Sequence, residues 1–264
     1  MSFSFTAVPI LFSAGQFTVY SWGLMNAIAL IVAGIFIYRN AKKQFSGNEI
    51  LEMIVSMIVG GIVFARLGYI LLNLSEFANF TSIFSISNGG MEGFGGLIGG
   101  IFGGWAYSRM KKLDFGKFLD ISAPWIALAF AIGRIGCFLR GCCFGLPTNL
   151  PWGIIYNDGS LASLYYSGAV HPTQLYHVLA DFLIFLVLIM INRRKEKKVI
   201  KLREKSGNLF LLFLVLYSTE RILIDFLRWK SPVDALGIFS VQQAAYLLLM
   251  LISIGIMVKN KKIS

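Results

Sequence analysis

Charged residues are scarce in this chain of 264 residues, where Asp, Glu, Lys and Arg together make up only 14%. Hydrophobic residues reach 56%, and the mean hydropathy is +0.71. A soluble domain carries about 25% charged residues, so this composition excludes an ordinary water-soluble protein. The chain also lacks repeats and low-complexity tracts. Its first 19 residues contain neither a basic region nor a small-residue cleavage site, so we expect no removable signal peptide.

Apolar stretches of about twenty residues, long enough to cross the hydrocarbon core of a bilayer, recur along the chain. They lie at residues 20–38, 50–73, 90–108, 118–138, 172–192, 207–227 and 237–258. We therefore predict an all-α, multi-pass membrane protein with about seven transmembrane helices, forming a single transmembrane domain over residues 1–264. The stretch at 90–108 is rich in glycine, which favours close packing of helices in lipid.

Acidic residues are the scarcer charge, with 13 Asp and Glu against 24 Lys and Arg and a net charge of +11. Most of the basic residues fall in four patches, at 39–43, 109–117, 193–205 and 259–262. These patches follow every second predicted helix, and the positive-inside rule assigns them to the cytoplasm. The N-terminus is then outside, the C-terminus is cytoplasmic, and residues 139–171 form an extracytoplasmic segment. Because the excess charge is explained by topology, we expect no nucleic-acid partner.

Six cations lie outside these patches: Arg66, Arg134, Arg140, Arg221, Arg228 and Lys230. An arginine at membrane depth costs about 2.5–3.5 kcal/mol and usually marks a site with an anionic partner. Arg134 lies at the outer end of a predicted helix, within Gly133-Arg134-Ile-Gly136, where glycines allow close approach. The alternatives for these arginines are snorkelling to the membrane surface and structural ion pairs.

The predicted helix at 207–227 ends in a stripe of charges. Arg221, Asp225 and Arg228 are spaced four and three residues apart and therefore share one helix face. The planar guanidinium group donates two parallel hydrogen bonds to a phosphate. Several arginines near the outer surface therefore predict a phospholipid headgroup site. A self-contained ladder of ion pairs is the alternative.

Histidine is limited to two residues, His171 and His177, and both lie at the start of the predicted helix 172–192. Gln174 and Tyr176 lie between them, and Asp181 follows Gln174 and His177 on one stripe. Histidine is the side chain best suited to exchange protons near neutral pH, so this is the candidate location of a general acid or base. The alternative is that both histidines only orient the loop.

Cysteine is limited to Cys137, Cys142 and Cys143, which cluster within seven residues. We expect free thiols that pack as small apolar side chains. An extracytoplasmic location also permits a disulfide between Cys137 and one of the other two. A metal site formed with His171 is a further alternative, although the spacing matches no familiar zinc pattern. A nucleophilic cysteine beside Arg134 is chemically feasible.

The sequence indicates no metal requirement, no cofactor and no nucleotide-binding fold.

In combination, these motifs resemble those of the prolipoprotein diacylglyceryl transferases of the bacterial inner membrane. The shared elements occur in the same order over most of the chain: Gly23-Leu-Met, Ala65-Arg66-Leu-Gly-Tyr69, Gly89-Gly-Met, Gly95-Gly-Leu-Ile-Gly, Gly133-Arg134-Ile-Gly136, Pro151-Trp152-Gly153, His171-Pro-Thr-Gln-Leu-Tyr176 and the stripe Arg221, Asp225, Arg228. The resemblance implies a multi-pass enzyme of lipoprotein biosynthesis in the bacterial cell membrane.

The resemblance implies a reaction and its partners. The family transfers the diacylglyceryl group of phosphatidylglycerol to the lipobox cysteine thiol, next to the signal-peptide region of a preprolipoprotein, and releases glycerol phosphate. By this resemblance Arg134 and Arg221 bind the phosphate, and Asp225 holds Arg221. Candidate catalytic residues are Arg134, Arg221, His171 and His177. Candidate substrate-binding residues are Arg66, Arg134, Arg140, Gln174, Tyr176, Arg221, Asp225 and Arg228.

The chain departs from the family pattern at several polar positions. Phe94 stands where the family has an essential histidine, and Cys137, Cys142, His177 and Trp22 replace asparagine, an acidic residue, glutamate and tyrosine. Two hypotheses follow. Either the protein is a lipid-modifying transferase in which His171, His177 or Glu92 replaces the missing base, with a prolipoprotein or another acceptor, or it is a non-catalytic protein that binds or moves phospholipid.

Overall fold

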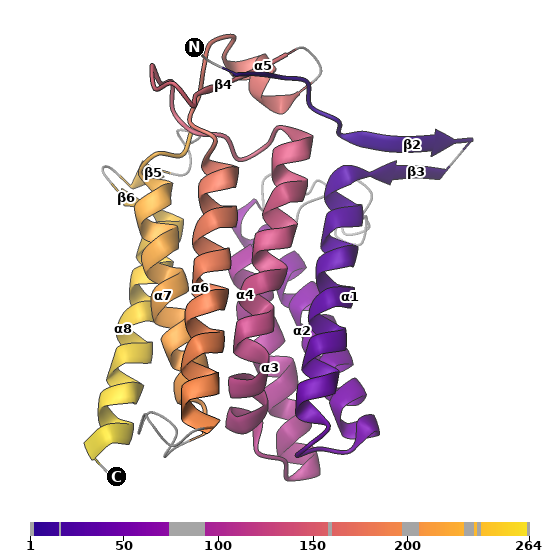
Figure 1. The fold of residues 1–264 in the computed structure, drawn as a ribbon, viewed down its shortest axis with the longest axis vertical. Coiled ribbons are helices and arrows are strands. Elements are labelled where there is room, and N and C mark those ends of the chain that lie inside the picture. The colour runs from indigo at the N-terminus through magenta and orange to yellow at the C-terminus, as the bar shows by residue number, and fades with distance from the viewer. Residues whose placement is uncertain are drawn as a thin grey trace. The chain divides into compact units, whose positions relative to one another are not determined.

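The computed structural model of this chain describes residues 3–15, 17–73, 93–157, 160–196, 206–229, 235–236 and 239–262. The described residues form mainly long helices, with three two-stranded sheets (Figure 1). They group into two compact units, residues 1–37 with 119–264 and residues 38–118. The single transmembrane domain over residues 1–264 therefore stays a prediction.

Each of the seven predicted apolar stretches overlaps one long helix. The helices are α1 (Ser21–Ala41), α2 (Gly47–Leu72), α3 (Gly93–Lys111), α4 (Phe115–Arg140), α6 (Thr173–Glu196), α7 (Asn208–Asp225) and α8 (Val241–Lys262). Of these, α1, α2, α4, α6 and α8 are long and apolar enough to cross a membrane. Glycine lowers the hydropathy of α3, and three charged residues interrupt α7. The count of seven spans and their orientation remain predictions.

The glycines of the Gly-Arg-Ile-Gly motif face α1. A Cβ atom on Gly136 would lie 3.0 Å from the Cβ of Met25 and 3.1 Å from the Cα of Trp22, so a larger residue would have to push α1 away by a few tenths of an ångström. Further along the same two helices, Phe36 stacks on Trp125 with ring centroids 4.3 Å apart. This packing fixes the rotation of α4 and turns the arginine of the motif toward another face of the helix.

The strands and the short helix of the first unit form a small cap at one end of its long helices (Figure 1). The strands are β1 (Phe3–Phe5), paired in parallel with β4 (Ile154–Tyr156); β2 (Ile10–Ala14), paired with β3 (Phe17–Tyr20); and β5 (Ala235–Leu236), paired with β6 (Phe239–Ser240). The cap also contains the short helix α5 (Leu161–Tyr165). Ala7, Phe144, Ile154, Tyr156, Ala162 and Val170 form its apolar core. The all-α prediction did not anticipate these strands, which are two to five residues long.

The second unit is built on the contact between α2 and α3. A Cβ atom on Gly99 would overlap the carbonyl oxygen of Gly60, and one on Gly103 would overlap the carbonyl oxygen of Ser56. The two backbones therefore touch directly, as the glycine-rich sequence predicts. One polar contact of this pair lies at an exposed end, where Glu52 accepts a hydrogen bond from Tyr107 at 2.7 Å.

Candidate functional site

Ionisable side chains gather within the first unit where α4 and α7 end and α6 begins, next to the cap. Nδ1 of His177 on α6 contacts Oε1 of Glu220 on α7, and these side chains are only 4% and 6% exposed. Arg134 on α4 interacts electrostatically with both Glu220 and Asp181. Buried charges are costly unless they are paired. Three helices that are otherwise apolar therefore share one polar cluster, formed by Arg134, His177, Asp181, Glu220, Arg221, Asp225 and Arg228.

Arg221 is held by aromatic rings and by a histidine. Its guanidinium carbon lies 5.2 Å from the ring centroid of Tyr246 and 5.8 Å from that of Tyr217, in cation–π range. Its Nη1 atom lies 3.5 Å from Nε2 of His177. These three residues position Arg221.

Asp225 contacts Arg228 and Ser240, the residue that precedes α8. One carboxylate oxygen accepts a hydrogen bond from the Ser240 hydroxyl at 2.7 Å, and the other lies 3.9 Å from Nη1 of Arg228. Arg228 also donates to Oε1 of Gln242 at 3.1 Å and approaches Sγ of Cys143 at 3.7 Å. Because α7 ends at Asp225, the predicted shared helix face holds for Arg221 and Asp225 only, and Arg228 follows the helix and lies beside Asp225.

The residues after α7 are joined to the segment after α4 by backbone hydrogen bonds. Leu146 N–H donates to the carbonyl of Leu227 at 2.8 Å, and Trp229 N–H donates to the carbonyl of Phe144 at 3.0 Å. Gly145 lies between these bonds, and a Cβ atom there would come within 2.6 Å of the Leu227 oxygen. This tight junction fixes Arg228 next to the cysteine-containing segment.

The first residues of α6 hold the same segment from the other side. Thr173 Oγ1 donates to the carbonyl of Cys143 at 2.7 Å, and Gln174 Nε2 donates to the carbonyl of Cys142 at 2.6 Å. Both side chains are fully buried. The predicted substrate-binding residue Gln174 therefore positions the backbone of the segment through its amide nitrogen.

His171 and Tyr176 belong to a separate hydrogen-bonded chain at the edge of the cap. Nδ1 of His171 lies 3.1 Å from the hydroxyl of Tyr176, and Trp152 Nε1 donates to the same hydroxyl at 2.8 Å. Desolvation lowers the pKa of His171, which favours the neutral imidazole. The two histidines, close in sequence, thus have different surroundings, and only His177 contacts the polar cluster.

Several buried polar atoms, two in the cluster and two on neighbouring residues of α6 and α7, have no hydrogen-bond partner among the described residues. They are Asp181 Oδ1, Glu220 Oε2, Ser218 Oγ and Gln174 Oε1. An unsatisfied buried polar atom costs about 1–3 kcal/mol, so folding alone does not favour such an arrangement. Unused hydrogen-bonding capacity beside three arginines is typical of a site that receives a polar ligand.

The remaining candidate residues are not members of this cluster. Arg140 is exposed at the end of α4 and, within the described residues, makes no hydrogen bond or ion pair. Arg66 belongs to the second unit, where it lies 5.9 Å from the ring centroid of Tyr69. Phe94 begins α3 in that unit. Glu92 and Lys230 lie outside the described residues.

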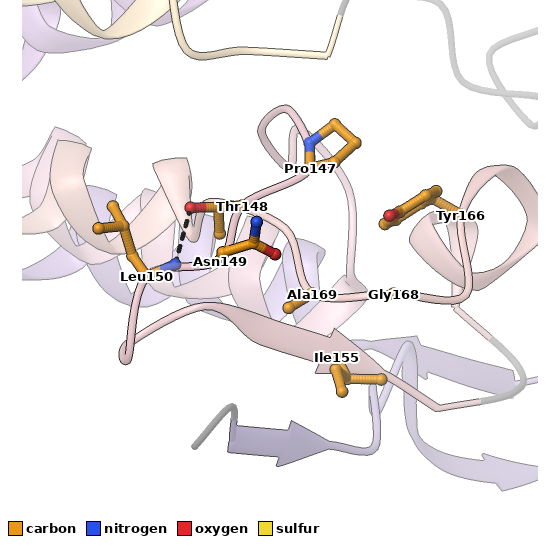
Figure 2. Close-up of a pocket in the computed structure, with 8 residues that line it drawn as sticks. All are labelled: Pro147, Thr148, Asn149, Leu150, Ile155, Tyr166, Gly168 and Ala169. Carbon is orange, nitrogen blue, oxygen red and sulfur yellow. Dashed lines mark hydrogen bonds between the residues drawn. The ribbon is translucent and has the colours of Figure 1, made fainter.

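A hollow of about 690 Å³ lies in the cap, but its chemistry differs from that of the cluster. It is lined by Pro147, Thr148, Asn149, Leu150, Ile155, Tyr166, Gly168 and Ala169 (Figure 2). None of these residues is Arg, Lys, His, Asp or Glu. The hollow therefore offers no charge to a phosphate, and the arginine cluster is the better candidate for an anionic ligand.

The sequence did not single out Glu220, Tyr217 or Tyr246 as functional. Glu220 directly precedes Arg221, so helical periodicity places the two side chains in different directions. The only signal was the occurrence of an acidic residue within an apolar run. Which neighbouring helix it faces depends on tertiary packing.

Comparisons with known proteins cover nearly the whole chain. A family model described as prolipoprotein diacylglyceryl transferase matches residues 9–259. Three similar proteins, each named phosphatidylglycerol–prolipoprotein diacylglyceryl transferase, come from Clostridium tetani, Clostridioides difficile and Geobacter sulfurreducens. The first is 33% identical over 253 residues, covering 96% of both chains. The second is 36% identical over 212 residues, covering 80% of this chain and 79% of the relative. The third is 33% identical over 240 residues, covering 88% and 85%.

Proposed function

The chain belongs to the prolipoprotein diacylglyceryl transferase family, and from this premise we propose that it transfers the diacylglyceryl group of phosphatidylglycerol to a preprolipoprotein. The sulfur of the lipobox cysteine attacks the glycerol carbon that carries the phosphate. A carbon–sulfur bond forms, the carbon–oxygen bond breaks, and glycerol phosphate leaves with the electron pair. The observation that carries this proposal is the cluster of Arg134, Arg221 and Arg228 at the end of apolar helices.

The arginines act on the phosphate of the lipid. Negative charge grows on the leaving phosphate as the carbon–oxygen bond breaks, and fixed guanidinium groups stabilise that charge without reorganising. Arg221 is preorganised by Tyr217 and Tyr246, and Arg228 by Gln242 and Asp225. Arg134 supplies a third positive charge from α4.

His177 is the general base in this proposal. Nδ1–H donates to the Glu220 carboxylate, and the Nε2 lone pair faces Nη1 of Arg221 at 3.5 Å. Binding of the lipid phosphate to Arg221 replaces this contact and frees the Nε2 lone pair. Nε2 accepts the proton of the substrate thiol, and the carboxylates of Glu220 and Asp181 stabilise the imidazolium that results. The pair of His177 and Glu220 would thus do the work that the family assigns to a histidine at the position of Phe94.

We place the capped end of the first unit at the outer surface of the bacterial inner membrane. Arg193, Lys259 and Lys261 lie near the opposite ends of α6 and α8, which supports this orientation by the positive-inside rule. Phosphatidylglycerol then enters from the outer leaflet, and the signal-peptide region of the preprolipoprotein docks beside the cap.

Complementation tests the function. The gene is expressed in a strain depleted of its own diacylglyceryl transferase, and thioether lipidation of a reporter prolipoprotein is measured. We expect rescue by the wild type, loss of rescue in Arg134→Ala and His177→Ala, and retained rescue in Arg193→Ala. Failure of wild-type protein that is inserted in the membrane would contradict the proposal and favour a non-catalytic lipid-binding protein.

A further inference from the structure

The end of α4 brings two cysteines together. Gly141 adopts φ +70°, its N–H donates to the carbonyl of Phe138 at 3.0 Å, and Cys142 N–H donates to the carbonyl of Cys137 at 3.1 Å. This pair of hydrogen bonds is a Schellman motif, which closes a helix with a glycine in the left-handed conformation. The chain therefore turns back, and Cys142 lies over Cys137.

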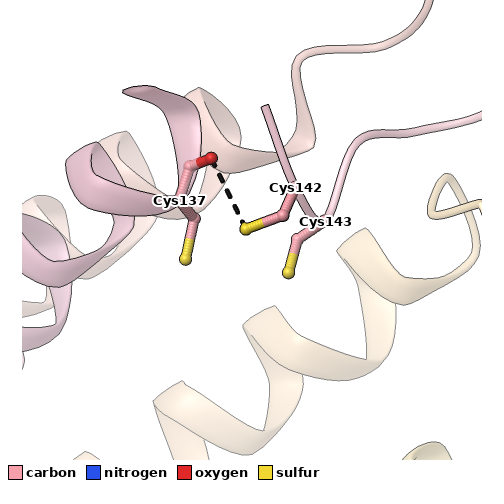
Figure 3. Close-up of side chains that lie close together, drawn as sticks. All are labelled: Cys137, Cys142 and Cys143. Atoms are coloured by element: carbon pink, nitrogen blue, oxygen red, sulfur yellow. Dashed lines mark hydrogen bonds between the residues drawn. The ribbon is translucent and has the colours of Figure 1, made fainter. Parts of the chain in front are cut away.

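The side chain of the third cysteine, Cys143, points toward the other two. Cys143 has φ +60°, which is uncommon for a residue with a side chain. The hydrogen bond from Thr173 to its carbonyl and the approach of Arg228 to its sulfur hold this conformation. As a result, the Sγ atoms of Cys137, Cys142 and Cys143 all lie within 4.8 Å of one another, and all three thiols are free (Figure 3).

This spacing fits one metal ion. A Zn²⁺–sulfur bond measures about 2.3 Å, so three sulfurs around one ion are about 3.8–4.0 Å apart. Three sulfurs already within 4.8 Å reach that separation by small side-chain rotations. Three soft donors select thiophilic ions such as Zn²⁺ and Cu⁺ over Mg²⁺ or Ca²⁺.

The surroundings favour the thiolate form that a metal requires. The guanidinium of Arg228 lies 3.7 Å from Sγ of Cys143, and Arg134 precedes Cys137 by one helical turn. Two fixed positive charges stabilise negative charge on the sulfurs. The sulfur atoms also lie at the junction of α4, α6 and the segment after α7, where hydrogen bonds on both sides hold the backbone.

We propose that Cys137, Cys142 and Cys143 bind one thiophilic metal ion, with Zn²⁺ as the test ion. The sequence predicted no metal, because four residues between the first and second cysteine and none between the second and third form no familiar zinc motif. The three sulfur atoms are brought together by the turn at the end of α4 and by the left-handed backbone conformation of Cys143, neither of which is visible in the spacing. The ion would take the sulfur of Cys143 as a ligand and leave Arg228 free to bind phosphate.

Zinc titration of the purified full-length protein in detergent tests the site. The reduced, metal-stripped protein competes with a chromophoric chelator for Zn²⁺. We expect one ion per chain and a loss of affinity of at least about tenfold in each of Cys137→Ser, Cys142→Ser and Cys143→Ser, since even changes outside the ligand set cost metal sites that much. The matched control is His171→Ala, which should bind Zn²⁺ as the wild type does.

Cysteine protection provides a second measurement that needs no variant. Zn²⁺ bound to the wild type should slow alkylation of all three cysteines together, as counted by intact-protein mass spectrometry. Co²⁺ in place of Zn²⁺ should give a thiolate-to-metal charge-transfer band. Lack of binding by the reduced protein, or Zn²⁺ affinity unchanged when all three cysteines are serine, would overturn the proposal. Because the readout is metal binding, it is independent of transferase activity.

Discussion

The contact between α2 and α3 and the cluster at the ends of α4, α6 and α7 show two different ways to join apolar helices. Between α2 and α3, glycines let the backbones touch, and the ion pair of Glu52 with Lys111 lies at the surface, with side chains 52% and 54% exposed. In the cluster, His177 and Glu220 are almost completely buried, and nearby polar atoms have no partner among the described residues. The first contact joins two helices through their backbones, whereas the second retains buried charge, which we propose binds a ligand.

The largest effect is expected when a cation is removed from the cluster. Arg221→Ala should lower transferase activity by about 100-fold or more, because a preorganised donor to developing charge contributes that much to catalysis. Thermal stability should change little, since Arg221 contacts rings and a histidine and has no carboxylate partner among the described residues. The measurement is lipidation of a reporter by purified protein. Arg193→Ala, at the other end of α6, is the control, and wild-type rates in Arg221→Ala would contradict the assignment.

A smaller effect is expected when the partner of His177 is changed. Glu220→Gln keeps a hydrogen-bond acceptor for Nδ1 but removes the negative charge that stabilises the imidazolium. We expect activity to fall roughly tenfold, toward the low end of general-base contributions, and the acidic limb of the pH–rate profile, which reports protonation of the base, to move. Activity would be measured across pH for Glu220→Gln and Glu220→Asp. An unchanged profile in Glu220→Gln would remove Glu220 from the mechanism.

A substitution in the glycine contact between α2 and α3 should lower the stability of the protein and leave the catalytic residues unchanged. Gly99→Ala places a methyl group against the carbonyl of Gly60 and should cost about 1–3 kcal/mol. Gly34→Ala on α1 is the matched control, because its Cβ would meet no atom within 4 Å. Thermal unfolding in detergent would measure both variants. Equal stability would show that α2 and α3 do not depend on backbone contact.

The position of the helices could be predicted from sequence, but the site only in part. A run of about twenty apolar residues specifies a membrane helix by itself, and so all seven stretches overlap helices. Arg134, Arg221 and His177 stood out because charge is rare in such runs. The contact of His177 with Glu220 joins residues 43 positions apart, and periodicity gives the face of each helix without its neighbour.

The cap was the least predictable part of the fold. Its strands are two to five residues long, and β1 pairs with β4 from the other half of the chain. Such short segments carry no periodic signal, and their pairing depends on the packing of helix ends. Part of the clustering of the three cysteines could be predicted from Gly141, because a glycine at the end of an apolar helix indicates a turn. Nothing in the sequence indicates the left-handed backbone conformation of Cys143.

The smallest effect concerns His171, outside the cluster. Its pKa is lowered below the ordinary 6.5 by desolvation, so the folded protein favours the neutral imidazole. As pH falls below 6.5, the unfolded chain therefore binds a proton at His171 more readily than the folded protein does. The free energy of unfolding decreases over this range and stops decreasing once the pH is below the folded-state pKa. NMR titration of ¹⁵N-histidine-labelled protein, assigned with His177→Gln, would report the value. A pKa at or above 6.5 would contradict this placement of His171.

The most direct test of the arginine site is a reconstituted reaction in nanodiscs that contain phosphatidylglycerol and a reporter preprolipoprotein. Glycerol phosphate release and thioether product would be measured by mass spectrometry. We predict equal amounts of both products with the wild type and neither with Arg134→Ala or Arg221→Ala, when both variants are folded and reconstituted. Full turnover by either variant would contradict the claim that the cluster binds the phosphate of the lipid.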